Sequence, residues 1–424
     1  MNRSPVRRLV TAVATALVLG LGASVLVAAP ASADAVRDLE YWLSQYGVQK
    51  AWATTRGAGV TVAVIDTGVD GSHPDLAGAV IGGTDVSGVG SPDGQTPIGE
   101  NSKHGTMVAS LLAGRGRGSG DGVIGVAPEA KLLSVSVGFG LGTIGSDDQI
   151  AAAVRWSVDN GADIINMSLT RNTLDWPASW DAAFLYAMEK GVIVVAAAGN
   201  RGSGTTEVGA PATMPGVVVV AGVDRSGVAS FDASSQGITL SVSAPSEGLV
   251  GAAPGGGYYS WAGTSGATPL VSGALALIKS AHPGLSAGNV INRLTATARP
   301  RGNPIVYGSG LFDASAAVGA TVASVRADPA DDLRNWIRLN RRAATTAEPK
   351  PASPVPVTGR PAPAVIAAPL SPFGRVLPGV GDLRDIGIPV LVYAVFATLL
   401  ILILRSILRD LTRFRESKGS RRRQ

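Results

Sequence analysis

Short runs of β-branched residues alternate with longer helix-like segments through the middle of the chain, between about residues 34 and 325. The short runs are almost continuously apolar, as expected for strands buried on both faces; they cover residues 60–65, 132–137, 164–167, 192–197 and 217–220. The helix-like segments cover residues 104–113, 147–160, 180–190, 265–280 and 286–298. This alternation predicts an α/β fold with a doubly wound parallel sheet and helices on both faces.

The first 33 residues have the layout of a secretory signal peptide. Arg7 and Arg8 precede a long apolar or small stretch, and Ala31-Ser32-Ala33 forms an A-x-A cleavage site. The apolar stretch is on the long side for a signal peptide, so an uncleaved anchor helix is the alternative.

The last part of the chain indicates a membrane anchor. Residues 386–404 form an uncharged run of about 19 residues, or about 28 Å as a helix, which is enough for a transmembrane helix. The tail at 405–424 is strongly basic, so the positive-inside rule places it in the cytoplasm. Residues 326–385 are rich in Pro and Ala and predict a stalk, with a short helix at 331–342 as an option. A buried core helix is the alternative for residues 386–404.

Charge and cysteine content narrow the class of protein. The formal net charge is +5, but three arginines precede the first apolar stretch, and eight basic against two acidic residues follow the last one. The part between them therefore has about four more acidic than basic side chains, so the basicity reflects membrane topology and not a nucleic-acid surface. The chain has no cysteine, which excludes disulfides and thiolate metal sites.

Three short segments place reactive side chains at the ends of predicted elements. Asp66 in VIDTG directly follows a buried strand, at the carboxyl end where parallel sheets carry functional residues. His104 in KHGT opens a helix, and Ser265 in GTSGATP begins another, where the helix dipole favours a developing negative charge. Each residue alone has an ordinary interpretation, as a helix cap, a surface imidazole or an N-cap serine.

Together the three residues supply what a nucleophilic serine site needs. A serine hydroxyl attacks when a base takes its proton, which imidazole does near neutral pH. A carboxylate fixes the tautomer of that imidazole and stabilises its cation. Donors must also face the oxyanion of the tetrahedral intermediate, and Asn200 in AAAGN offers a side-chain amide just after a predicted strand.

The segments VIDTGVDGSHPDL, HGTMVAS, AAAGN and GTSGATPLVSG resemble the motifs of the subtilisin family of serine proteases, in the family's order. The resemblance covers roughly residues 52–316 and implies a serine endopeptidase with a subtilisin-like fold. It implies Ser265 as the nucleophile, His104 as the base and then the acid, and Asp66 as the residue that orients His104. The Asn200 side chain and the Ser265 backbone N–H would form the oxyanion hole.

The same resemblance implies substrate-binding residues and no cofactor. Ser168 and Leu169 would pair with a peptide substrate as an added strand, and Gly199 would lie near the floor of the pocket for the residue before the scissile bond. A structural calcium ion is an option because many relatives bind one, but the acidic residues within 85–100 show no ligand spacing. No metal ligand is therefore assigned, and His73 and His282 are given no catalytic or metal role.

Two positions depart from the family's pattern. Thr170 stands where glycine is usual, and its β-branched side chain would narrow the substrate groove near the scissile bond. Gly266 stands where a large residue usually follows the nucleophile, and it would open the leaving-group side or loosen the turn. The specificity of secreted relatives therefore does not transfer to this chain.

The overall layout resembles the mycosins, the membrane-anchored proteases of actinobacterial type VII secretion systems. It comprises a signal peptide (1–33), an N-terminal extension (34–59), a peptidase domain (60–325), a stalk (326–385), a transmembrane helix (386–404) and a basic cytoplasmic tail (405–424). The extension is too short to fold as an independent pro-domain, so it is expected to pack on the peptidase domain.

The mycosin resemblance implies a single-pass cell-membrane protein whose catalytic domain is extracytoplasmic. Its partners would be protein or peptide substrates, the membrane and the type VII secretion machinery, with no nucleic acid. The alternative is a protease-like structural subunit that stabilises a secretion complex, with catalysis dispensable.

Overall fold

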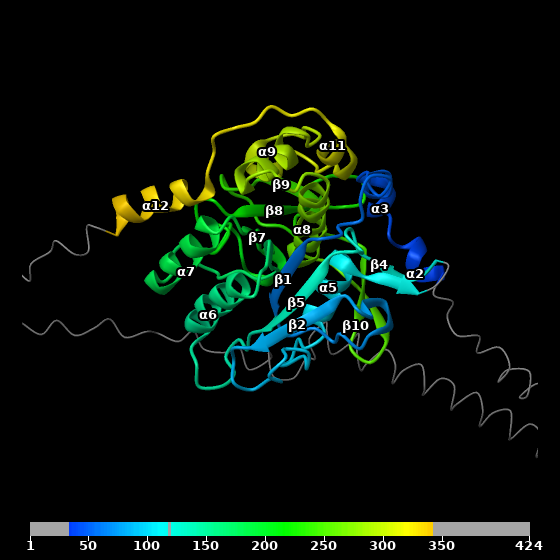
Figure 1. Cartoon of the computed structure of the whole chain (residues 1–424), viewed down its shortest axis with the longest axis horizontal. Helices are drawn as coiled ribbons and strands as arrows, with labels where there is room; N and C mark the ends of the chain where they lie inside the picture. Colours follow the sequence, from blue (N-terminus) through cyan, green and yellow to red (C-terminus); the bar gives the residue numbers. More distant parts are fainter. Residues whose placement is uncertain (1–33, 118–119, 342–424) are drawn as a thin grey trace, which may run out of the picture. The chain divides into compact units, whose positions relative to one another are not determined.

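The computed structural model describes residues 34–117 and 120–341. Its central sheet has seven parallel strands in the order β2-β5-β1-β6-β7-β8-β9 (Figure 1). Five of these strands correspond to the predicted apolar runs: β1 (Thr61–Asp66), β5 (Lys131–Ser136), β6 (Ile164–Met167), β7 (Ile193–Ala197) and β8 (Val218–Val223). The predicted α/β fold with a parallel sheet is confirmed.

Helices cover both faces of the sheet and enclose two apolar cores. Along β1, Val62 and Val64 belong to the first core, whereas Ala63 and Ile65 belong to the second. This two-sided burial is why the strands are apolar throughout, without polar alternation. The helices of the first core are α5 (His104–Ala113), α8 (Thr264–Ala281) and α9 (Ala287–Ala296), and those of the second are α6 (Ser146–Asp159) and α7 (Ala178–Glu189).

The sequence did not predict the two edge strands. β2 (Val80–Asp85) contains two glycines and is partly exposed, and β9 (Val242–Pro245) has only four residues. Neither therefore shows a long β-branched run. Two antiparallel hairpins lie outside the main sheet: β3 (Arg115–Arg117) with β4 (Asp121–Ile124), and β10 (Leu249–Ala253) with β11 (Gly257–Trp261).

The N-terminal extension packs on the peptidase domain. It forms α2 (Asp34–Asp38), α3 (Trp42–Gln45) and α4 (Val48–Ala51), and Trp42 and Val48 are fully buried in the first core. The buried carboxylate of Glu40 pairs with Arg37 (2.9 Å) and accepts the N–H of Ile124 in β4 (3.1 Å). The extension is thus tied to the domain by both apolar and polar contacts.

Part of the predicted stalk, which was expected to begin at residue 326, is a helix packed on the domain. α12 (Pro329–Asn340) packs on α7, with Ala330 and Leu333 buried in the second core. Just beyond it, Arg341 Nε pairs with Asp181 Oδ2 of α7 at 2.7 Å. The apolar residues of α12 recur at helical spacing, and this pattern outweighs the proline-rich composition on which the stalk prediction rested. The remaining short helices are η1 (Pro74–Leu76), η2 (Arg201–Ser203), α10 (Pro304–Tyr307) and α11 (Ala314–Gly319).

Within residues 34–117 and 120–341, no helix has the length and apolar character needed to cross a bilayer. The predicted signal peptide (1–33), the remainder of the stalk (342–385), the predicted span (386–404) and the basic tail (405–424) lie outside the described residues. Those assignments stay predictions.

Candidate active site

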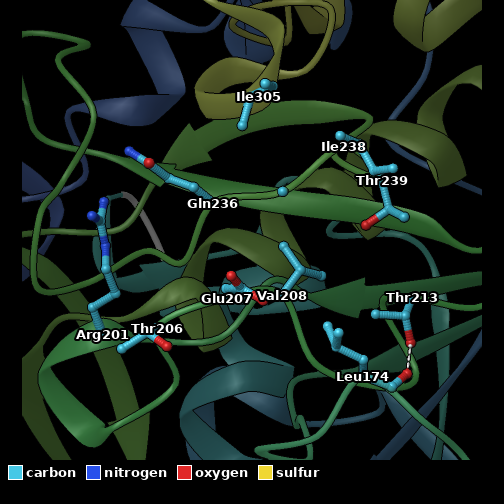
Figure 2. Close-up of a pocket in the computed structure, with 11 residues that line it drawn as sticks. Leu174, Arg201, Thr206, Glu207, Val208, Thr213, Gln236, Ile238, Thr239 and Ile305 are labelled. Carbon is cyan, nitrogen blue, oxygen red and sulfur yellow. Dashed lines mark hydrogen bonds between the residues drawn. The ribbon is translucent and has the colours of Figure 1, made fainter.

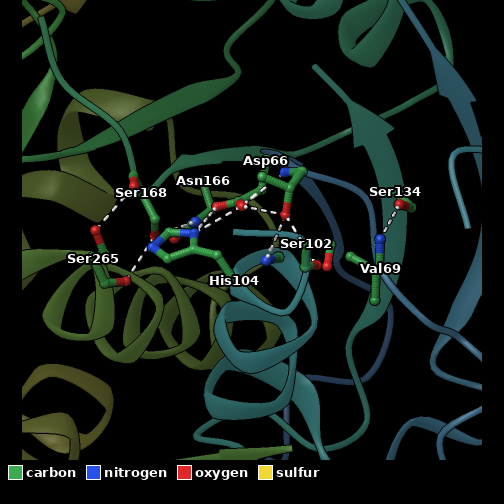
Figure 3. A network of polar contacts seen from close by, with 10 residues as sticks. Asp66, Val69, Ser102, His104, Ser134, Asn166, Ser168 and Ser265 are labelled. Carbon is green, nitrogen blue, oxygen red and sulfur yellow. Dashed lines mark hydrogen bonds and ion pairs between the residues drawn. The ribbon is translucent and has the colours of Figure 1, made fainter. Parts of the chain in front are cut away.

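Asp66 and His104 meet at the carboxyl end of β1. Asp66 is the last residue of β1 and His104 the first of α5, and His104 Nδ1 lies 2.8 Å from Asp66 Oδ1 and 3.0 Å from Oδ2 (Figure 3). The Asp66 carboxylate is buried and also accepts the N–H of Thr67 (2.8 Å). Gly105 permits this approach, because a Cβ there would overlap the carbonyl oxygen of Gly68. The imidazole is thereby held in one orientation.

The pKa of His104 lies above its ordinary value. Burial of the imidazole alone would lower this pKa, but the negative charge of Asp66 and the hydrogen bond to it outweigh burial. The His104 side chain is still 22% exposed, so part of the ring is open to a substrate. Such a residue can take up a proton and hold it as a stabilised cation.

Ser265 lies in the first turn of α8, against Ser168 just after β6. The Ser265 hydroxyl donates to the Ser168 carbonyl oxygen (3.1 Å), and the Ser168 hydroxyl donates to the Ser265 carbonyl oxygen (2.8 Å). Figure 3 shows Asp66, His104 and Ser265 gathered in one network. In the described part of the chain, the Ser265 hydroxyl is bonded to Ser168 and not to His104, so it must turn before it can give up its proton.

Two buried side chains that sequence reasoning missed brace Ser168. Asn166 Nδ2 donates to Ser168 Oγ (3.0 Å), and Ser272 Oγ donates to Asn166 Oδ1 (2.8 Å). Asn166 and Ser272 are both fully buried. An asparagine inside an otherwise apolar strand run was the signal that could have found this network, because a buried amide needs hydrogen-bond partners.

Asn200 lies beside the N-terminus of α8, and Thr264 fixes its amide. The backbone N–H and the hydroxyl of Thr264 both donate to Asn200 Oδ1, at 2.8 and 2.9 Å. With the oxygen occupied in this way, the amide presents its Nδ2 group as a donor. Nδ2 would lie 3.1 Å from a Cβ on Gly263, the residue that precedes Thr264, so a side chain there would crowd the amide.

Gly199 precedes Asn200 in the turn after β7 and packs against Thr205. Its φ of +101° lies in the region that favours glycine. Its N–H donates to Thr264 Oγ1 (3.1 Å), and a Cβ on Gly199 would come within 2.6 Å of Thr205 Cγ2. The contact with Thr205 means that Gly199 borders a filled space on that side.

Leu169 and Thr170 continue the segment that follows β6. Leu169 is half-buried against the second core. The hydroxyl of Thr170 donates to the carbonyl oxygen of Arg171 (3.1 Å), and a Cβ on Gly209 would lie 2.8 Å from that hydroxyl. The hydroxyl therefore faces the Gly209 loop, and narrowing of the groove by Thr170 stays a prediction.

Gly266 does not open the leaving-group side, contrary to the expectation from sequence. A Cβ on Gly266 would overlap Leu249 Cδ1 and come within 3.2 Å of Trp261 Cζ2, because the β10–β11 hairpin packs on this turn. The Trp261 ring also stands edge-on to the His104 ring, with centroids 5.7 Å apart and planes at 78°. Leu249 and the indole of Trp261 together occupy the space that the missing side chain leaves.

A cavity of about 660 Å³ borders the catalytic pair. It is lined by Thr67, which follows Asp66, and by residues that include Ile98, Phe139 and Leu141. Its position makes it the candidate for the substrate cleft, and its walls combine these apolar side chains with the polar side chains of Glu100 and Asn101.

A larger pocket, of about 860 Å³, lies elsewhere (Figure 2). Its lining includes the exposed apolar side chains of Leu174, Ile238 and Ile305, and it contains none of the predicted site residues. The pocket's size alone therefore does not locate the chemistry.

The acidic loop residues and the two remaining histidines have structural partners. In residues 34–117 and 120–341, no group of His, Cys, Asp or Glu side chains is placed to hold a metal ion. Asp85 accepts the hydroxyl of Ser87 (2.6 Å). His73 Nδ1 accepts the N–H of Asp75 at the start of η1 (3.1 Å), and His282 Nε2 bonds the carbonyl oxygen of Val318 (2.8 Å).

The sequences of known proteins match the part of this chain that contains the site. The model of the subtilase family, Peptidase_S8, matches residues 57–320. Subtilisin E of Bacillus subtilis (strain 168) is 41% identical over 264 residues, which are 62% of this chain and 66% of the length of subtilisin E. The match includes Asp66, His104, Asn200 and Ser265, since all four lie within residues 57–320.

Two solved proteins from type VII secretion systems have similar structures. MycP1 from the ESX-1 type VII secretion system has a TM-score of 0.58 and 29% identity, over 67% of this chain and 86% of that one. The MycP3 protease from the type VII (ESX-3) secretion system has a TM-score of 0.57 and 32% identity, over 66% of this chain and 88% of that one.

Proposed function

This chain belongs to the subtilase family and carries the site of a serine endopeptidase, and we propose that it cleaves exported proteins while anchored in a membrane. The observation that carries the catalytic part is the cluster of Asp66, His104 and Ser265 at the ends of β1, α5 and α8. Subtilases need no cofactor for catalysis, and the proposed steps use only side chains and backbone groups of this chain.

Catalysis begins when the Ser265 hydroxyl leaves the Ser168 carbonyl oxygen and turns to His104 Nε2. The imidazole takes the proton as Ser265 Oγ attacks the scissile carbonyl carbon. Asp66 stabilises the resulting imidazolium through the contacts to Nδ1. His104 then gives the proton to the leaving amine, and water hydrolyses the acyl-enzyme by the same sequence of proton transfers.

The negative charge of the tetrahedral intermediate needs donors that are in place before the reaction. Asn200 Nδ2 is suited to this role because Thr264 holds the amide by its oxygen. The backbone N–H of Ser265 lies in the first turn of α8, where the helix dipole adds to the stabilisation. These donors cost no reorganisation when the charge appears.

Two observations support a place in a type VII secretion system. MycP1 and MycP3 resemble this chain at 29% and 32% identity over about two thirds of its length. The sequence outside the described residues predicts a signal peptide, a stalk, a transmembrane helix at 386–404 and a basic cytoplasmic tail. The peptidase domain would then act on the extracytoplasmic side, on substrates or components of the machinery.

Labelling with a fluorophosphonate tests the catalytic proposal. The full chain in membranes is expected to react at Ser265, and Ser265→Ala and His104→Ala are expected to remove the label. A melting curve for each variant shows that the fold is kept. Folded wild-type protein that takes no label would contradict the proposal.

Comparison of secreted proteins tests the biological role. A strain with Ser265→Ala is expected to secrete the same set of proteins with altered cleavage, measured by quantitative proteomics. Normal secretion and normal processing in Ser265→Ala, but loss of secretion after deletion of the gene, would instead support the structural-subunit alternative. Fusion of a cytoplasm-dependent reporter to Gln424 tests the predicted topology.

A further inference from the structure

The residue on the leaving-group side of the scissile bond must lie beside His104. The amine of that residue receives its proton from His104 Nε2, so its nitrogen comes within hydrogen-bond distance of the ring. The acyl half of the substrate lies on the other side, along Ser168 and Asn200. The side chain that follows the scissile bond therefore meets whatever packs against His104 beside the turn that carries Ser265, on the flank of the leaving group.

Trp261 and Gly266 form that flank. The Trp261 ring stands edge-on to His104, 5.7 Å between centroids, and a Cβ on Gly266 would lie 3.2 Å from its Cζ2 and 3.3 Å from its Cη2. The Trp261 side chain is half-buried, so part of it stays exposed beside His104. It stands between the base and the residue that follows the nucleophile.

Neighbouring residues of the hairpin and of α5 hold the Trp261 ring in place. Leu249 lies opposite Trp261 in the hairpin, is fully buried, and would overlap a Cβ on Gly266. Gly251 of β10 lies against Met107 of α5: a Cβ on Gly251 would come within 2.9 Å of Met107 Cβ. The hairpin therefore packs directly on the helix that begins with His104. The indole N–H is buried and has no hydrogen-bond partner within residues 34–117 and 120–341. Packing alone thus fixes the ring, and it cannot move aside without displacing its neighbours.

We infer that Trp261 is a specificity-determining residue that restricts the position after the scissile bond to small side chains such as Gly, Ala and Ser. This inference rests on the proposed peptidase activity and names the substrate class of that same site. Gly266 complements Trp261, because a side chain at position 266 would overlap Leu249 and crowd the indole, and so would displace the hairpin that holds the ring. A large side chain after the scissile bond would compete with the indole for the same volume beside His104.

The test uses the full chain in detergent and a proteome-derived peptide library, with cleavage sites identified by mass spectrometry. Wild type is expected to cut before Gly, Ala and Ser. Trp261→Ala is expected to accept Leu and Phe after the bond, with their rate relative to Ala rising about tenfold or more. Trp261→Phe, which keeps an aromatic ring in the core, is expected to fall between the two. Ser260→Ala, an exposed neighbour on the opposite face of β11, is the matched control and should keep the wild-type profile.

Active sites are titrated with a fluorophosphonate in every variant, so that folding and specificity are read separately. Cleavage before Leu and Phe by wild type, or an unchanged profile in labelled Trp261→Ala and Trp261→Phe, would overturn the inference while leaving the proposed function intact. Absence of any cleavage by folded wild type overturns the proposed function, and the inference with it.

Discussion

Ser168 and Ser265 exchange two hydrogen bonds, in which the hydroxyl of each donates to the carbonyl oxygen of the other, at 2.8 and 3.1 Å. One of these bonds holds the backbone of the nucleophile's turn. The other holds the nucleophile itself and must break before attack. The residue that would pair with the substrate therefore also sets the resting position of the catalytic hydroxyl.

Replacing Ser168 with alanine is expected to lower kcat by about tenfold to a hundredfold, because the nucleophile's turn loses its support. The free energy of unfolding should fall by about 1–3 kcal/mol, since the buried Asn166 amide loses an acceptor. Kinetics and denaturant unfolding measure the two effects. Ser272→Ala removes the other partner of Asn166 and should lower stability with kcat nearly unchanged. Equal kcat losses in both variants would argue against the proposed link.

The two hydrogen bonds from Thr264 to Asn200 are expected to affect kcat. Thr264→Val removes the hydroxyl donor but keeps the N–H, and we expect kcat to fall about tenfold with KM little changed. Thr264→Ser keeps the hydroxyl and is the control. Asn200→Ala should cost about 10²–10³-fold in kcat, which is the loss that subtilisin shows for its own oxyanion asparagine. A normal kcat in Thr264→Val would show that the amide needs no such support.

The activity should rise with pH through a pKa above 6.5, because the base must be unprotonated and Asp66 raises the pKa of His104 over that ordinary value. Asp66→Asn removes the charge, so the acidic limb of kcat/KM should move to lower pH while its plateau falls by about 10⁴-fold. Profiles between about pH 5 and 9 measure both changes. A limb that stays in place would mean that another group controls it.

His73 makes the fold sensitive to acid. Burial lowers the pKa of His73 below 6.5 and outweighs the attraction of Asp75 and Asp70, while Arg117 lowers it further. The Tyr258 ring packs edge-on against the imidazole. Because the folded pKa is below the unfolded value, the stability from the neutral ring is present above the unfolded pKa and is lost as pH falls toward the folded one.

The Tm of the wild type is therefore expected to drop between about pH 7 and pH 5, and His73→Asn should drop less steeply. Asparagine keeps an acceptor for the Asp75 N–H but does not titrate in this range. Thermal melts at matched ionic strength give the comparison. Parallel curves for the two proteins would show that His73 contributes nothing to the acid response.

Because α12 is docked, truncating its buried leucine should lower the free energy of unfolding strongly, whereas truncating an exposed leucine on the same helix should hardly change it. Leu333 is fully buried, so Leu333→Ala should lower the free energy of unfolding by about 2–5 kcal/mol. Leu339 lies on the same helix but is 65% exposed, so Leu339→Ala should change it by less than about 0.5 kcal/mol. Denaturant unfolding measures both. Equal small effects would show that the docking of α12 on α7 does not stabilise the domain.

The sequence predicted the central strands and singled out Asp66 because both have a local signature in the sequence. A strand buried on two faces is apolar throughout, and Asp66 follows such a strand directly. The edge strand β2 has no such signature, since its partly exposed backbone runs through Gly82 and Gly83. Its place in the sheet depends on pairing with β5, which is distant in sequence.

The errors concern contacts between distant segments. Gly266 indicates an open space only as long as no other side chain fills it. Leu249 fills it together with Trp261, and the pairing of these two residues in the β10–β11 hairpin was not predicted. The Asn166–Ser168–Ser272 network likewise joins residues more than a hundred positions apart. The helix in α12 could be read from its periodicity, but its docking depends on Asp181 and the surface of α7.

The packing of Trp42 and Glu40 into the domain also bears on whether the N-terminal extension could act as an inhibitory pro-segment. A zymogen is activated by shedding a segment that folds separately and blocks the cleft. The segment at 41–51 does not fold separately: its buried side chains, among them Trp42 and Val48, are part of the first core, and removing them would expose that core to water. Proteolytic trimming of this segment is therefore expected to destabilise the domain and not to uncover its cleft.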